Sequence, residues 1–153
     1  MLGKKLLDKN GRNLLPVSHE HFVREIVENA IFESDNYSDC QFQRVQLKSL
    51  NLKTFYFANC HFKHNYWREV NLSRCRFRNC VFEGSIWKGV VFDGCVFMEC
   101  EFKSCSLEVE FIDTIGLDTQ FSEGCTITGK FTRTMLTNNT PPSKKADQMA
   151  KAA

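Results

Sequence analysis

Large apolar residues recur at every fifth position through most of the chain. The series holds for sixteen consecutive steps: Phe42, Leu47, Leu52, Phe57, Phe62, Trp67, Leu72, Phe77, Phe82, Trp87, Phe92, Phe97, Phe102, Leu107, Ile112 and Leu117. A period of five matches neither a helix, at 3.6 residues per turn, nor a single strand, at two. It predicts a chain that turns a corner every five residues.

A second series, of small residues, runs two positions ahead of the first. All eight cysteines have numbers that are multiples of five: Cys40, Cys60, Cys75, Cys80, Cys95, Cys100, Cys105 and Cys125. We expect each five-residue side to point its large residue and the small residue before it inward. Four sides then return the chain above its start after 20 residues, so that successive coils pair as parallel strands about 4.8 Å apart.

This pattern resembles the pentapeptide-repeat proteins, most clearly at residues 75–79 (CRFRN), 80–84 (CVFEG) and 95–99 (CVFME). The resemblance covers about residues 30–118, and more weakly extends to 137. It implies an all-β fold, a right-handed quadrilateral parallel β-helix. The family commonly has Asp or Asn before the large residue, whereas here only Asn51 and Asn71 match. The resemblance therefore transfers the fold better than any one activity.

Folding the numbering by 20 predicts which side chains stack between coils. Cys40, Cys60, Cys80 and Cys100 should form one column beside Phe42, Phe62, Phe82 and Phe102. Phe57, Phe77 and Phe97 should form another, and Trp67 should lie below Trp87. Rings stacked in this way add to the energy of burial.

The two ends depart from the repeat and define three predicted regions. Residues 1–29 are expected to cap the coil with a hairpin at 6–15 and a helix over 19–29, although an early coil of the β-helix also fits the spacing. Residues 30–137 are expected to form the β-helix, degenerate after about 118, and 138–153 a disordered tail. Glu110 falls on an inward position, and a local slip at Val109–Phe111 is one explanation.

The residues that could carry chemistry point to no enzyme. The cysteines lie in the inward phase and without Cys-x-x-Cys spacing, which favours buried free thiols over zinc ligands or a nucleophile. His61 and His64 fall on outward positions and are expected on a solvated surface. We therefore predict no catalytic residue, no metal and no cofactor.

Charge changes sign along the chain although the net charge is only +2. Residues 40–80 carry eight lysines and arginines against Glu69 alone, a net +7, whereas residues 81–123 carry two against nine acids, a net −7. The β-helix should therefore be basic in its first half and acidic in its second. The predicted basic surface comprises Lys63, Arg68, Arg74, Arg76 and Arg78.

Some outward positions are apolar, which predicts an interaction surface. Val81, Ile86, Val91 and Val96 occupy them on four successive sides, forming a girdle around one coil. Folding by 20 also stacks Val91, Phe111 and Phe131 on one side. This hypothesis predicts self-association or a partner protein there, unless other segments cover the patch or the slip turns Phe111 and Phe131 inward.

Two functions remain. The first is a non-catalytic scaffold that binds an unknown protein, because stiff coils with variable outward residues suit binding; the resemblance includes bacterial effectors. The second, which the resemblance implies, is modulation of DNA gyrase or another topoisomerase by imitating DNA. The basic half weakens that alternative, and the chain also lacks a clear platform for nucleic acid. With no apolar run long enough to cross a membrane and no export signal, we expect a cytoplasmic location.

Overall fold

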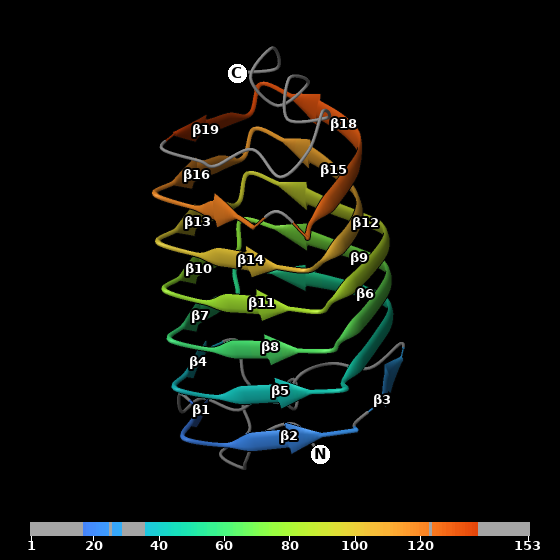
Figure 1. Ribbon diagram of the computed structural model, residues 1–153, viewed down its shortest axis with the longest axis vertical. Coiled ribbons are helices and arrows are strands. Elements are labelled where there is room, and N and C mark those ends of the chain that lie inside the picture. The colour runs from blue at the N-terminus through green and yellow to red at the C-terminus, as the bar shows by residue number, and fades with distance from the viewer. Residues whose placement is uncertain (1–16, 25, 29–35, 123, 138–153) are drawn as a thin grey trace.

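The computed structural model describes residues 17–24, 26–28, 36–122 and 124–137, and these consist of parallel strands and turns without a helix (Figure 1). The strands form three sheets in which each strand pairs with the strands one coil away. The first sheet, side 1, contains β1 (Val17–Ser18), β4 (Asn36–Ser38), β7 (Tyr56–Ala58), β10 (Arg76–Arg78), β13 (Val96–Met98), β16 (Ile115–Leu117) and β19 (Met135–Thr137).

The other two sheets complete the perimeter. Side 2 contains β2 (His21–Val23), β5 (Gln41–Gln43), β8 (His61–Lys63), β11 (Val81–Glu83), β14 (Glu101–Lys103) and β17 (Gln120–Phe121). The third sheet contains β3 (Ile26–Glu28), β6 (Gln46–Lys53), β9 (Tyr66–Ser73), β12 (Ile86–Asp93), β15 (Ser106–Ile112) and β18 (Thr126–Thr132). Its long strands turn a corner midway, at Ser49 in β6, and so carry both side 3 and side 4. The predicted four-sided parallel β-helix is confirmed.

The corners explain why five residues make a side. The residue two positions after each large apolar residue adopts a positive φ, near +54° at Asn59 and His64, which turns the backbone into the next side. Asn, Asp and Gly tolerate this left-handed conformation best. Sixteen of the described non-glycine residues adopt it, so the fold imposes the conformation on many residues that do not favour it.

The interior is a set of stacked rings. The Phe42–Phe62–Phe82–Phe102 column has centroid spacings of 4.8, 4.7 and 4.7 Å with nearly parallel rings. Phe57, Phe77 and Phe97 stack at 5.1 and 4.9 Å, and Trp67 lies 4.9 Å from Trp87. The columns touch edge to face, so the two favourable ring geometries alternate through the core. All the ring and thiol positions of the predicted columns are buried.

The predicted helix over 19–29 is wrong. Residues 21–23 and 26–28 form β2 and β3, which pair in register with β5 and β6 one coil above. Phe22 stacks on Phe42 at 5.0 Å, and His19 and Arg24 turn corners with positive φ. A spacing of four between Phe22 and Ile26 suggested a helix, but the five-residue phase of Val17 and Phe22 decides the structure. The β-helix therefore begins by residue 17 rather than 30.

The predicted slip near Val109 is confirmed as a one-residue shift in the register between β12 and β15. Trp87 pairs with Leu107 twenty residues later, but Phe92 pairs with Phe111, nineteen residues later, because β15 omits the corner residue that Gly89 supplies in β12. Phe111 is consequently buried and Glu110 points outward, which avoids a buried carboxylate. The expected inward residues Ile112 and Leu117 instead face outward, and Gly116 takes the inward position.

Coils continue beyond the slip rather than decaying. Ile127 and Phe131 stack over Leu107 and Phe111, and β19 still pairs with β16. The predicted hairpin at 6–15 and the tail at 138–153 lie outside the described residues. Among the described residues, the structure has no helix of the length and apolarity needed to span a membrane.

Candidate binding surface on side 1

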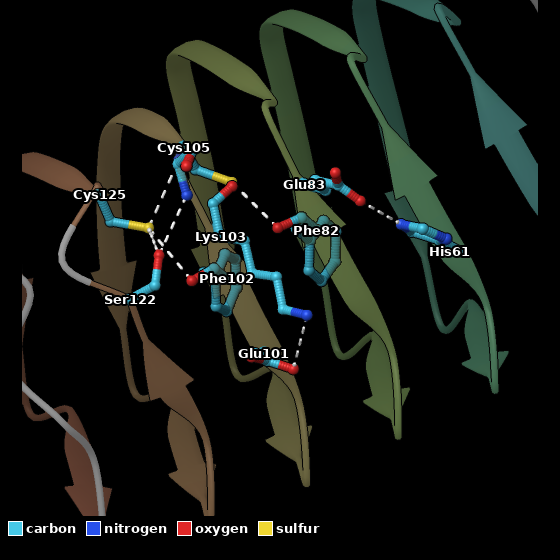
Figure 2. Close-up of polar contacts among 10 residues, drawn as sticks. His61, Phe82, Glu83, Glu101, Phe102, Lys103, Cys105, Ser122 and Cys125 are labelled. Atoms are coloured by element: carbon cyan, nitrogen blue, oxygen red, sulfur yellow. Dashed lines mark hydrogen bonds and ion pairs between the residues drawn. The ribbon is translucent and has the colours of Figure 1, made fainter.

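The cysteines occupy the interior. All eight are buried free thiols. Cys105 Sγ lies 3.2 Å from the carbonyl oxygen of Phe82, and Cys125 Sγ 3.2 Å from that of Phe102, one coil below in each case (Figure 2). Burial raises the pKa of the Cys80 thiol, which keeps it protonated at neutral pH. These thiols fill space and bridge coils.

The outward surface of side 2 is polar and internally paired. His61 Nε2 lies 3.0 Å from a Glu83 carboxylate oxygen, and Lys103 Nζ lies 3.5 Å from Glu101 (Figure 2). The first pair joins β8 to β11, the second lies within β14, and all four side chains are partly exposed. They satisfy one another's charge, and exposed pairs of this kind contribute little to stability.

Neither a metal cluster nor a deep pocket stands out on the described part of the chain. No group of three or more His, Cys, Asp or Glu side chains could hold a metal ion among those residues. The corner between sides 3 and 4 bears an open groove of about 220 Å³, whose lining includes Val91, Glu108, Glu110 and Lys130. It lies at the slip, where β12 has one residue more than β15.

The predicted interaction surface is partly wrong. Val91 pairs with Glu110 rather than with Phe111, and Phe111 is only 2% exposed. Phe131 packs over Phe111 with a centroid spacing of 5.5 Å. These three residues therefore do not share one outward surface, because the slip turns Phe111 and Phe131 toward the core.

The predicted girdle does point outward, but onto four different sides. Ile86 is 43% exposed, and Val81, Val91 and Val96 are half-buried. Val81 lies on side 2, Ile86 on side 3, Val91 on side 4 and Val96 on side 1. A single flat partner cannot contact all four.

The predicted basic surface is likewise divided among the sides. Lys63 lies in β8 on side 2, and Arg68 in β9 on side 3. Arg76 and Arg78 lie in β10 on side 1, with Arg74 at the corner just before them. Only these last three gather in one place, and they form no ion pair with other described residues.

Above this arginine strand, side 1 carries an apolar patch. Val96, Ile115 and Met135 stand in register on three neighbouring strands, and Met98 stands in register with Leu117. Ile115 is 40% and Met135 51% exposed, while the other three are half-buried. We call these five residues the side-1 patch. Apolar side chains contiguous over three outward-facing strands are typical of a protein interface.

The slip hid this patch from the sequence. Aligning the sequence in coils of 20 residues places Gly116 beside Val96 and Asp118 beside Met98. That alignment predicts no apolar patch at these positions. The observed register instead places Ile115 and Leu117 there. A search for apolar outward pairs spaced by 19 as well as 20 residues would find the patch.

The repeats also identify the family. A family model for pentapeptide repeats (9 copies) matches residues 57–108. The chain carries pentapeptide repeats. This confirms the predicted family, and the repeats span β7 to β15, which include the lower strands of the side-1 surface.

Whole-chain comparisons add the following. A solved structure of trypsin-treated QnrB1, a plasmid-mediated fluoroquinolone resistance protein, is similar over 82% of this chain and 84% of that chain, with 15% identity and a TM-score of 0.24. No curated protein sequence matches the chain.

Proposed function

We propose that this pentapeptide-repeat protein is a non-catalytic scaffold that binds another protein chain through side 1. The observation that carries the proposal is the side-1 patch, together with the neighbouring arginines, which form no ion pair within the described part of the chain. A pentapeptide side offers a flat, stiff surface whose outward residues can vary without disturbing the core. Binding to such a surface costs little ordering of the protein itself.

The side-1 patch suits contact with another protein better than the other three sides do. Side 2 has paired charges. Sides 3 and 4 carry mostly charged residues and amides in their outward positions, with Ile26 and Ile86 on side 3 and Val91 on side 4 among the apolar exceptions. The hydrogen bond between Asn71 and Asn51, 3.1 Å, is an example of an outward column that is already satisfied. Removing apolar surface from water on side 1 contributes about 25 cal/mol per Å² buried.

The experiment is photo-crosslinking from the patch in cells that make the protein. A photoreactive residue replaces Ile115, and a second version carries it at Gln120, an exposed position of β17 on side 2. We expect protein adducts, identified by mass spectrometry, from position 115 but not from 120. Adding Met98→Asp should abolish them. Equal adducts from both positions, or none, would contradict the proposal.

A further inference from the structure

Side 1 changes character along the axis of the β-helix. From β7 to β19 its outward pairs are Tyr56 with Ala58, then two arginines, then the side-1 patch. Acidic residues occupy both corners of β16, with Asp113 before it and Asp118 after it, whereas Arg133 occupies the corner before β19. The corners beside β10 carry Arg74 and Asn79 instead. Side 1 is therefore basic at one end and apolar with an acidic rim at the other.

A surface of this kind complements itself when turned upside down. We propose, building on the proposed function, that the chain bound by side 1 is a second copy of this protein. The two β-helices pack side 1 against side 1 with their axes antiparallel and the two-fold axis crossing β13. This arrangement places β10 of each copy opposite β16 of the other, and β7 opposite β19.

The apolar contacts match in this register. Val96 and Met98 of β13 meet the same residues of the second copy across the two-fold axis. Tyr56 in β7, which is half-buried, faces Met135, the most exposed residue of the patch at 51%. The hydrocarbon stem of Arg76 covers Ile115 while its charged end reaches the rim.

The charges match at both edges in the same register. A two-fold axis along the strands keeps residues at the same strand end together. Arg78, near the end of β10, therefore meets Asp118, and Arg74, before β10, meets Asp113, which Arg133 already binds within its own chain. A parallel arrangement would instead set the arginine strands of the two copies against each other.

One unfavourable contact comes with this geometry. Glu99, at the corner after β13, lies close to the two-fold axis and meets Glu99 of the second copy. Neutralising it should strengthen the dimer. This outcome sets the proposed register apart from a dimer formed by another side, in which Glu99 would have no such effect.

Sedimentation velocity of the full chain over a hundredfold range of concentration tests the inference. We expect a reversible monomer–dimer equilibrium that Arg78→Asp and Asp118→Arg each weaken about tenfold, because like charges then meet. The double variant should restore dimerisation to within about threefold of the original, and Glu99→Gln should strengthen it. Arginine suits the corner conformation at 118, since Arg44 and Arg74 already adopt it.

The control is Arg68→Asp, which makes the same charge change on side 3 and should leave the equilibrium unchanged. Thermal melts of each variant check that the β-helix is intact. A wild-type chain that stays monomeric, or a double variant as weak as the singles, overturns the antiparallel dimer. If the chain is monomeric but position 115 still crosslinks to a different protein, the proposed function stands and only the dimer fails.

Discussion

At the scale of single residues, the stacked rings are the largest side chains buried in the core. Phe82 is fully buried and stacks at 4.7 Å on both Phe62 and Phe102. We expect Phe82→Ala to lower the free energy of unfolding by about 3–5 kcal/mol, because neighbouring coils cannot collapse into the space. Glu83→Ala, one residue away on the outer surface, should cost less than about 1 kcal/mol. Urea melts compare the two variants, and equal midpoints would contradict this account of the core.

Thr54 holds a corner conformation that suits it poorly. Its φ is +59°, and a β-branched side chain in the left-handed region is strained. Replacing it with Asn, which tolerates that region, should raise stability by about 0.5–1 kcal/mol. Thr126→Asn is the matched control, because Thr126 is an exposed strand residue and strands favour Thr. It should be neutral or destabilising. A Thr54→Asn variant that melts earlier than the original protein would refute the strain.

Stacked corner residues also pair charges. Arg133 donates hydrogen bonds of 2.6 and 3.0 Å from Nε and Nη2 to the two carboxylate oxygens of Asp113 one coil below, which lowers the pKa of Asp113. Since the folded pKa lies below the unfolded value, the pair stabilises the protein above the ordinary pKa of Asp, about 3.9. That contribution disappears as pH falls through the folded pKa. NMR titration should show the Asp113 pKa returning toward its ordinary value in Arg133→Gln; an unchanged value would exclude the pair in solution.

At the scale of elements, Gly129 permits β18 to stack on β15. Its φ is +134°, and a Cβ there would lie 1.8 Å from the carbonyl oxygen of Val109. Because backbone cannot move aside cheaply, Gly129→Ala should cost about 3 kcal/mol or more. Hydrogen exchange should show β18 losing protection before the lower coils do. Gly89→Ala is the control, because a Cβ there would make only ordinary van der Waals contact with Glu69 at 3.9 Å; its φ is +61° and the expected cost is about 1 kcal/mol. Similar protection of β18 in both variants would contradict this role.

The strands show where the five-residue period alone predicts the structure and where it does not. Every strand from β5 to β14 follows from the five-residue phase, because each buries its apolar residue only in that register. The slip needed a further argument, the cost of burying Glu110, and that argument located it correctly. The first coil was predicted only as the alternative to a helix, because Phe22 and Ile26 satisfy a helical spacing as well. A local sequence pattern does not include the stabilisation that β2 gains by pairing with β5 one coil away.

At the scale of the whole molecule, the binding surface was harder to foresee than the fold. Predicted surfaces at the girdle and among the basic residues were spread over several sides, since neighbours in sequence lie around a corner from one another. Residues such as Val96 and Ile115 become neighbours only once the register between coils is known, and that register shifts by one residue between them. Core positions before the slip carry no such ambiguity, because the five-residue phase alone fixes their neighbours, whereas Ile112 and Leu117 after it were expected inward and face outward.

The charge distribution of the whole molecule also bears on DNA mimicry. Imitating DNA requires acidic charge along a continuous surface, but Lys48, Arg68 and Lys88 stand in register as a basic column on side 3. We therefore expect no inhibition or protection of DNA gyrase in a supercoiling assay at concentrations where the chain dimerises. A variant with all three changed to Glu is the informative control, since it would create an acidic column on an unchanged core. If the original chain alters supercoiling, the basic column does not prevent mimicry. Protein binding through side 1 is then not the only function of the chain.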